Sequence, residues 1–417
     1  MRFPTLDQWL RWQESLHPSE IDLGLDRVQQ VLQRMQLGDS VFTVINVAGT
    51  NGKGSCVAML DAIYRAAGYK VGAYMSPHIK YYNERISING EQVSDDSLCE
   101  MFERVDQCRK NTSLTYFEFG TLAAIGLFYQ AQVDVAIMEV GLGGRLDAVN
   151  VLDADLALIS SIGLDHQAWL GDTRESVAIE KAGIARSHRP VVCGDPDPPA
   201  NMLDYLNGIE APVYLVNRDF YYQQTDATSW DWQHSGRQRA GLPLPALRGD
   251  IQLLNAASVL MAVDLLAQQM PVTQAEIRAG LSSVKLPGRF QVIAEKVNVV
   301  VDVAHNPQSA QALASTLKAW PCQGKIRAVF AVLNDKDVTG ILNAMTDIVD
   351  QWYIAQLDVR RAMSAGEILE RLRSVDSNVP AVCFKSVDLA KQAAIEQSAP
   401  QDRVVVFGSF FVVAEVL

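Results

Sequence analysis

The chain has 417 residues, which at about 150 residues per domain predicts roughly two or three domains. Hydrophobic residues make up 48% of the sequence and charged residues 20%, a composition that excludes disordered, collagen-like and disulfide-scaffold proteins. The 36 basic and 48 acidic residues give a net charge of -12, so we expect no nucleic-acid partner.

No stretch of the sequence approaches the roughly 18 consecutive apolar residues of a membrane span, and the N-terminal residues lack a basic segment followed by an apolar run. We therefore expect a cytoplasmic protein with no membrane partner. The six cysteines are scattered and no two of them form C-x-x-C. This spacing predicts reduced thiols and signals neither a disulfide framework nor a zinc site.

From about residue 41 onward, short β-branched runs alternate with longer helical patterns, which is typical of βα units wound around a mainly parallel sheet. The predicted strands are 42–47, 70–75, 134–140, 155–162 and 190–193, and the predicted helices between them are 55–67, 117–130 and 175–185. Gly68 follows the first helix in the position of a C-terminal cap. The sequence thus predicts an α/β domain.

The segment 214–247 is aromatic and polar and contains two prolines, which predicts an antiparallel excursion or a long loop, and 251–269 returns to a helical pattern. A second βα series follows, with strands expected at 297–303, 326–332, 352–355, 381–384 and 403–407. We place the domain boundary near Pro287. This gives a first domain of residues 1–287 and a smaller second domain of residues 288–417.

The strongest local motif, VAGTNGKGS at 47–55, lies between an apolar strand and an amphipathic helix, which indicates a phosphate-binding loop. Its glycines allow successive N–H groups to point at phosphate oxygens, and Lys53 adds a positive charge. The strict G-x-x-x-x-G-K-[ST] pattern is not met, because Gly54 follows the lysine and Ser55 comes one residue later. The alternative is a glycine-rich turn with an exposed lysine.

Magnesium would bridge phosphates bound at that loop, and oxygen ligands at strand ends are its expected protein partners. Glu139 ends an apolar strand at the predicted carboxyl edge of the sheet, although such a glutamate is more often a solvated surface charge. Ser76, in Ser76-Pro77-His78, offers a hydroxyl at the end of another strand, and its alternative is a plain Ser-Pro turn.

Two further candidate site residues, His166 and Lys181, have side chains that contain nitrogen. His166 follows a predicted strand on the same edge, where a lone histidine is usually structural. Lys181 falls on a predicted helix, where the ordinary interpretation is an exposed lysine. Near two magnesium ions an ammonium would be repelled, so a functional Lys181 would have to be neutral or converted into an anion such as a carbamate.

In the second domain, Asp302 and His305 come just past a buried strand, and Pro307 is predicted to open a helix. This pair would face a cleft between the domains. Arg289 directly follows the predicted linker and could reach a phosphate, or could bond to backbone carbonyls instead.

Several motifs occur together and in order: GTNGKGS (49–55), SPH (76–78), ERI (84–86), TYFE (115–118), EVGLGGRLDA (139–148), LDH (164–166), EKAGI (180–184), LPGR (286–289) and DVAHNP (302–307). With these motifs the chain resembles the folylpolyglutamate synthase/dihydrofolate synthase family of the Mur-ligase-like superfamily. The resemblance covers nearly the whole chain. It implies an α/β fold with a P-loop-containing, Mur-ligase-like central domain, a smaller Rossmann-like C-terminal domain and an active site between them.

The resemblance also implies roles for individual residues. ATP would be bound by Thr50, Asn51, Gly52, Lys53, Gly54, Ser55, Asn255, Arg289 and Asp302. Ser76 and Glu139 would hold one Mg²⁺ and His166 a second, and Lys181 resembles the family's carbamylated lysine. The pterin would be bound by Asp22, Leu23, Gly24, Thr115, Tyr116, Phe117, Glu118, Leu146, Asp147 and Ala148. The expected catalytic residues are Lys53, Lys181, Asp302 and His305.

The implied activity is ATP-dependent ligation of L-glutamate to dihydropteroate and to the γ-carboxylate of reduced folates through an acyl phosphate. The expected partners are these small molecules alone, and we expect a monomer. Three alternatives stay open at this point. One is a folylpolyglutamate synthase without the dihydropteroate activity. The second is a peptidoglycan-precursor ligase, although only about 40 residues precede the phosphate loop. The third is a P-loop protein that senses nucleotide without catalysis.

Overall fold

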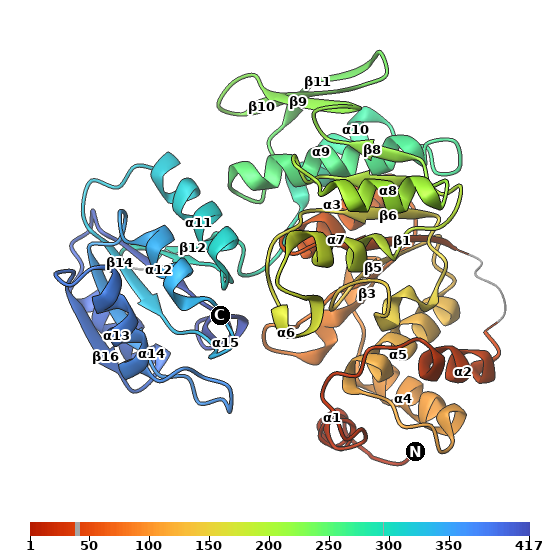
Figure 1. Cartoon of the computed structure of the whole chain (residues 1–417), viewed down its shortest axis with the longest axis horizontal. Coiled ribbons are helices and arrows are strands. Elements are labelled where there is room, and N and C mark those ends of the chain that lie inside the picture. Colours follow the sequence, from red (N-terminus) through yellow and green to blue (C-terminus); the bar gives the residue numbers. More distant parts are fainter. Residues whose placement is uncertain (38–41, 295) are drawn as a thin grey trace. The chain divides into compact units, whose positions relative to one another are not determined.

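The computed structural model describes residues 1–37, 42–294 and 296–417 (Figure 1). The chain forms two compact units. Unit 1 contains Met1–Ala246 and Leu253–Val284, and unit 2 contains Leu247–Gln252 and Lys285–Leu417. Among the described residues, no helix is long and apolar enough to cross a membrane.

Unit 1 is built on a sheet of eight strands within the described residues, in the order β4-β3-β2-β5-β1-β6-β7-β8. The strands from β2 to β8 in this order pair in parallel, and β3 and β4 add an antiparallel edge. The strands are β1 Thr43–Ala48, β2 Val71–Tyr74, β3 Ile86–Ile88, β4 Glu91–Gln92, β5 Val135–Glu139, β6 Leu156–Ile159, β7 Val191–Cys193 and β8 Val213–Leu215. The central strands are buried along nearly their whole length because helices cover a parallel sheet on both faces.

The helices that follow the strands include α3 Lys53–Ala66, α5 Tyr116–Ala131, α7 Arg174–Ala182 and α8 Ala200–Gly208. Helix α10, Gln274–Ser283, packs closely on α3, where the missing side chain of Gly280 makes room for Ile63. The helices α1 Leu6–Glu14, α2 Asp26–Met35 and α4 Asp95–Arg109 gather around α5 (Figure 1). Short helices complete the unit: η1 Tyr82–Arg85, η2 Ala148–Val151 and α6 Gln167–Leu170.

Of the two alternatives left for segment 214–247, the antiparallel excursion is correct. The strands β9 Phe220–Gln224, β10 Ser229–His234 and β11 Arg237–Pro243 form an antiparallel sheet. Two fully buried tryptophans fix this sheet, since Trp230 donates its indole N–H to the carbonyl of Pro243 and Trp232 donates to Ala257 at 3.1 Å. Ala257 lies in α9, Asp250–Leu265, so the sheet is anchored to the helical part of unit 1.

Unit 2 has a six-stranded sheet within the described residues, in the order β12-β13-β17-β14-β15-β16, which is parallel except for β12. Its strands are β12 Gln291–Ala294, β13 Asn298–Val301, β14 Ile326–Phe330, β15 Gln351–Ala355, β16 Ala381–Phe384 and β17 Arg403–Phe407. The helices are α11 Pro307–Ala319, α12 Val338–Met345, α13 Ala365–Val375, α14 Val387–Glu396 and α15 Phe410–Ala414. The rings of Phe330, Trp352 and Phe407 pack together in its core. The predicted α/β class is confirmed.

Candidate functional site

The phosphate-loop motif forms a tight turn between β1 and α3. Gly49 and Gly52 have φ values of +152° and +87°, which L side chains rarely adopt, and α3 begins at Lys53. Because the first N–H groups of a helix have no partner within the helix, this turn presents backbone donors at the carboxyl edge of the sheet. The Lys53 ammonium donates to the carbonyls of Gly49 at 3.0 Å and Thr50 at 3.4 Å. The turn therefore has the geometry of an anion-binding loop.

Two serines just past β6 hold this loop, and the sequence analysis did not identify them. The Oγ of Ser161 accepts from the Asn51 amide at 3.0 Å, and the Oγ of Ser160 donates to the Asn51 carbonyl at 2.6 Å. The backbone N–H of Thr50 donates to the Ser161 carbonyl at 2.8 Å. Since β6 pairs in parallel with β1, a polar pair at its carboxyl end lies beside the loop, and this was the signal available in the sequence.

Helix α9 brings Asn255 against the same loop. A Cβ placed on Gly52 would lie 2.6 Å from Oδ1 of Asn255, whose residue is only 3% exposed. The structure thus brings Asn255 next to the predicted ATP-binding residues of unit 1, which are Thr50, Asn51, Gly52, Lys53, Gly54 and Ser55.

The predicted metal ligands Glu139 and Ser76 meet at the carboxyl ends of β5 and β2. The Glu139 residue is 5% exposed, and its Oε2 accepts a hydrogen bond from the Ser76 amide at 3.0 Å. Glu139 is therefore a buried carboxylate, and the alternative of a solvated surface charge is wrong. Carboxylate and hydroxyl oxygens are the donors that Mg²⁺ prefers, so this pair fits such an ion.

Among the described residues, no group of three or more His, Cys, Asp or Glu side chains forms a metal site by itself. His166 lies on the loop after β6 in a left-handed conformation, with φ at +51°, and is exposed. Its amide donates to Oδ1 of Asp165 at 2.8 Å.

Lys181 is 3% exposed in α7, so the exposed-lysine interpretation is wrong. Burial and, to a smaller extent, the positive charge of Lys53 lower the pKa of its amine to about 7, and the charges of Asp165 and Asp147 oppose the shift. Burial also raises the pKa of the Asp147 carboxyl to about 7, against hydrogen bonds from Leu142, Val149 and Gly141 and the charge of Lys53. A substantial fraction of Lys181 is therefore the neutral amine near pH 7, and the side chain is close enough to the phosphate-loop lysine to feel its charge.

The three segments predicted to bind a pterin also come together. The Gly24 amide donates to the Leu146 carbonyl at 3.1 Å. Arg27, which the sequence analysis missed, donates to Asp22 at 2.8 Å and to Glu118 at 3.1 Å and so ties two of the segments together. The remaining members of the predicted set, Leu23, Thr115, Tyr116, Phe117, Asp147 and Ala148, belong to these same segments, and Thr115 caps α5.

In unit 2, the predicted residues gather at the carboxyl end of β13. Asp302 accepts from the amides of Phe290 at 2.7 Å and Ala304 at 2.8 Å. Burial raises the pKa of the Asp302 carboxyl, which these amide hydrogen bonds and the charge of Arg289 oppose. Arg289 stacks over the ring of Phe410 at 5.3 Å, and the His305 ring lies 6.0 Å from the same ring. The predicted start of a helix at Pro307 is confirmed.

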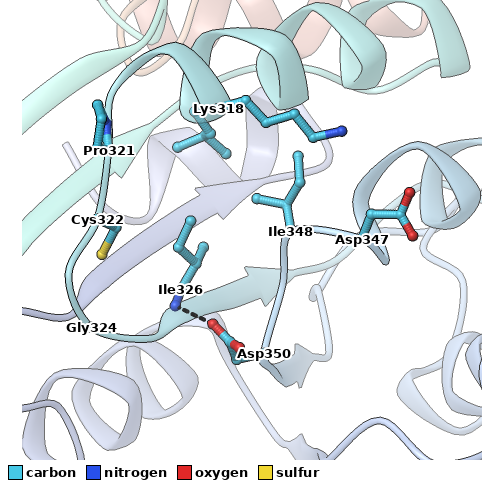
Figure 2. A pocket seen from close by; sticks show the side chains of 9 residues that line it. Lys318, Pro321, Cys322, Gly324, Ile326, Asp347, Ile348 and Asp350 are labelled. Atoms are coloured by element: carbon cyan, nitrogen blue, oxygen red, sulfur yellow. Dashed lines mark hydrogen bonds between the residues drawn. The ribbon is translucent and has the colours of Figure 1, made fainter.

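A separate pocket of about 240 Å³ lies in unit 2 (Figure 2). Its wall includes Ile326, the first residue of β14, whose amide donates to Asp350 at 2.7 Å. The other lining residues are Leu317, Lys318, Pro321, Cys322, Gly324, Asp347 and Ile348. This pocket lies at the amino end of β14 and contains none of the predicted site residues.

Two family models match this chain. The model described as Mur ligase middle domain matches residues 47–207, and the model described as Mur ligase, glutamate ligase domain matches residues 288–410. Together with the phosphate loop and the two α/β units, these matches define a protein of the Mur ligase class.

Full-length relatives narrow the class. The dihydrofolate synthase/folylpolyglutamate synthase of Escherichia coli (strain K12) is 42% identical over 412 residues, covering 99% of this chain and 94% of the relative. A structure of E. coli FolC in complex with DHPP and ADP has a TM-score of 0.93 at 42% identity and covers 99% of this chain and 96% of that chain. Another solved bifunctional folylpolyglutamate synthase/dihydrofolate synthase, with Mn, AMPPNP and L-glutamate bound, has a TM-score of 0.91 at 44% identity, covering 99% and 97%. The chain therefore belongs to the dihydrofolate synthase/folylpolyglutamate synthase family.

Proposed function

We propose that this chain ligates L-glutamate to 7,8-dihydropteroate and to the γ-carboxylate of reduced folates at the expense of ATP. One observation supports this proposal above the others: the phosphate loop, the buried carboxylate of Glu139 and the buried amine of Lys181 belong to the same site region. They occur in a chain that is 42% identical to a bifunctional synthase over 99% of its length. These groups are what an ATP-dependent ligase needs to transfer a phosphoryl group, because charge develops on the transferring oxygens.

The reaction follows from the chemistry of the substrates. A carboxylate oxygen of the acceptor attacks the γ-phosphorus, and ADP leaves with the electrons of the broken P–O bond. The amine of L-glutamate then attacks the carbonyl carbon of the acyl phosphate, inorganic phosphate leaves, and a proton is lost from nitrogen. In this proposal the loop amides and Lys53 bind the β- and γ-phosphates and offset their charge, while Asn255 contacts the nucleotide beside Gly52.

We assign the divalent metal to hard oxygen donors on this chain. Ser76 and Glu139 would hold one Mg²⁺, and His166 a second. Such an ion neutralises negative charge on the phosphoryl group being transferred. The supporting observation is the buried Glu139 carboxylate held by the Ser76 amide at the edge where the phosphate loop also lies.

Lys181 is proposed to carry a carbamate. Its neutral amine attacks the carbon of CO₂, an N–C bond forms, and the proton goes to solvent, which leaves a carboxylate where a cation would repel the metal. The low pKa of the amine supports this step, because only the unprotonated form is a nucleophile. The new carboxylate would carry a negative charge, which a bound metal cation attracts.

For the second domain, proposed as residues 288–417 after a first domain of 1–287, Arg289 and Asp302 are assigned to the nucleotide. His305 is assigned to positioning the incoming glutamate or the leaving phosphate. Its Nδ1 lies 2.8 Å from the Val303 carbonyl, which fixes the ring and directs Nε2 to other partners. We further propose that the enzyme acts in the cytoplasm as a monomer.

The experiment that tests the function measures phosphate release with MgATP and L-glutamate, using dihydropteroate, tetrahydrofolate or no acceptor, with products identified by mass. Turnover with both acceptors, each gaining one glutamate, is expected. Turnover with tetrahydrofolate alone would reduce the assignment to a folylpolyglutamate synthase and remove the pterin role of Asp22, Thr115 and Asp147. Absence of turnover with both acceptors would contradict the proposal.

A further inference from the structure

Arg85 is a buried cation without an anion. It lies at the end of η1 and is 8% exposed. Its Nε donates to Nδ1 of His78 at 2.8 Å, and its guanidinium stacks over the rings of Tyr82 at 5.3 Å and Tyr116 at 5.5 Å. Within residues 1–37, 42–294 and 296–417, no carboxylate forms an ion pair with it, and its further hydrogen-bond partner is the hydroxyl of Tyr74. The carboxylate of the neighbouring residue Glu84 does not pair with Arg85, because it accepts hydrogen bonds from the backbone amides of residues 79, 80 and 81.

The other buried arginines of the described chain each have carboxylate or carbonyl oxygen partners, although the Nε atoms of Arg327 and Arg403 have no hydrogen-bond partner among the described residues. Arg109 pairs with Asp106 at 2.8 Å, and Arg327 pairs with Asp402 at 3.1 Å. Arg403 donates to the carbonyls at positions 320 and 321. A buried charge costs free energy unless it is paired, and aromatic faces offset only a part of that cost. Arg403 also lacks an acid partner but has two carbonyl acceptors, whereas the partners of Arg85 among the described residues are the His78 ring nitrogen and the Tyr74 hydroxyl. Arg85 therefore differs from its counterparts in having neither a carboxylate nor a carbonyl acceptor, which is expected where a group is kept for a ligand.

One of the polar groups around Arg85 also lacks a hydrogen-bond partner among the described residues. The hydroxyl of Tyr82 is buried and has no hydrogen-bond partner among the described residues. It approaches the backbone at Gly120 so closely that an added Cβ would lie 2.4 Å away. The cluster thus contains a guanidinium and a hydroxyl, both buried among aromatic rings, and neither is paired with an acid.

The position of Arg85 places it beside both parts of the proposed site in unit 1. Its carbonyl accepts from the amide of Met75 at 2.8 Å, and the next residue, Ser76, binds Glu139. On its other side, Tyr116 belongs to the segment assigned to the pterin. The guanidinium itself contacts His78, two residues after Ser76, and the ring of Tyr116, so it lies beside both the segment proposed to bind the metal and the segment proposed to bind the acceptor.

We propose that Arg85 is a substrate-binding residue whose guanidinium binds a carboxylate of the folate acceptor or of the incoming L-glutamate. This inference rests on the proposed function, because that reaction supplies carboxylate ligands. A guanidinium presents parallel N–H donors that match the two oxygens of a carboxylate, which an ammonium cannot do. The phosphates already have Lys53 and the loop amides, so a carboxylate is the anion left for Arg85.

The test compares wild type with Arg85→Lys and Arg85→Gln by steady-state kinetics, varying L-glutamate, dihydropteroate, tetrahydrofolate and ATP in turn. Loss of a charged hydrogen-bonding partner is expected to raise one KM by at least about 10-fold. A rise for L-glutamate with either acceptor identifies the incoming amino acid. A rise for tetrahydrofolate alone identifies the α-carboxylate, which dihydropteroate lacks, and a rise for both acceptors identifies the reacting carboxylate.

The matched control is Arg109→Lys, which alters a buried arginine that also stacks on an aromatic ring, Trp12 at 5.0 Å, but has an acid partner. It is expected to lower Tm without changing any KM. If a variant of Arg85 turns over too slowly, equilibrium dissociation constants for the same ligands replace KM. Unchanged values for all three carboxylate substrates, or a change for ATP alone, would overturn the inference. Absence of turnover in the wild type would instead contradict the proposed function, so the two failures are distinguishable.

Discussion

Glu139 and Ser76 are joined by one hydrogen bond, in which the Ser76 amide donates to Oε2 of the glutamate at 3.0 Å. The bond joins the carboxyl end of β5 to the residues just past β2, and it fixes a buried carboxylate beside the phosphate loop. The Ser76 amide needs only an oxygen atom as acceptor, whereas a metal ion would need the negative charge of the Glu139 carboxylate. The observed hydrogen bond of Glu139 and its proposed role in metal binding can therefore be separated by substitution.

Glu139→Gln keeps an oxygen that can accept from the Ser76 amide but removes the charge. We expect turnover to fall by about 100-fold or more, with a higher magnesium requirement and a Tm within a few degrees of wild type. Phosphate release against magnesium concentration and thermal unfolding check this. Glu210→Gln, at an exposed position, is the control. An active Glu139→Gln enzyme with an unchanged magnesium requirement would contradict the metal assignment.

Gly52→Ala should weaken ATP binding. The new Cβ would lie 2.6 Å from Asn255 Oδ1, in a backbone conformation that disfavours alanine, so the loop or Asn255 must shift. Gly68→Ala is a matched control because its φ of +85° is nearly the same but no atom lies within 4 Å of the new Cβ. The control should lose only about 1 to 2 kcal/mol of stability, with the KM for ATP unchanged. Equal KM values in the two variants would contradict the assignment of Gly52 and Asn255 to the nucleotide.

The carbamate proposed for Lys181 predicts a signal that depends on pH. With ¹³C-labelled bicarbonate, NMR should show a carbamate carbon in the wild type and none in Lys181→Ala. The signal should weaken as the pH falls below about 7, because protonation of the amine at its lowered pKa removes the nucleophile. Lys181→Ala should lose about 100-fold in turnover. Lys385→Ala, remote in sequence and placed in unit 2, serves as the control.

Lys181 also predicts a pH dependence of stability in buffers free of CO₂. Its folded pKa of about 7 lies below its ordinary value of 10.5, so the unfolded chain binds more protons between these limits. The free energy of unfolding should therefore receive a contribution that increases from about pH 7 toward pH 10. Lys181→Met should lack this contribution, which urea unfolding at pH 7, 8 and 9 can measure. Parallel pH profiles for the two proteins would contradict the lowered pKa.

Trp232→Phe tests the attachment of the small antiparallel sheet. The substitution removes the indole N–H that donates to the Ala257 carbonyl and leaves a void in a fully buried position. We expect a loss of about 1 to 3 kcal/mol, measured by chemical unfolding. Trp169→Phe, at a side chain that is 48% exposed, should change stability by less than about 0.5 kcal/mol.

The repeating part of the fold could be predicted from the sequence because β-branched runs and helical periodicity are local properties. The strand expected at 42–47 is β1, Thr43–Ala48, and the helix expected at 117–130 is α5, Tyr116–Ala131. The strand expected at 155–162 ends earlier, at Ile159, because Ser160 and Ser161 use their side chains to hold the phosphate loop. The helices α1, α2 and α4 were not predicted.

The candidate site was less accessible to sequence reasoning, because burial is a property of the folded chain. Nothing in the helical pattern around Lys181 distinguishes a buried amine from an exposed one, and only the family resemblance favoured a functional reading. Arg85 appeared in the sequence solely as part of the motif ERI. Its missing acid partner became visible only when the residues packed around it were known.

Unit 2 is discontinuous in sequence, since it contains the short segment Leu247–Gln252 as well as Lys285–Leu417. Arg248 in that segment stacks over Trp320 at 5.2 Å, and the backbone at Gly249 approaches Thr316. The chain therefore passes between the two units three times. A fragment ending at Val284 would leave the segment without its packing surface, and a fragment starting at Lys285 would lack it. Separate expression of the two halves should accordingly give less soluble products than a permuted or internally tethered gene that keeps the segment with unit 2.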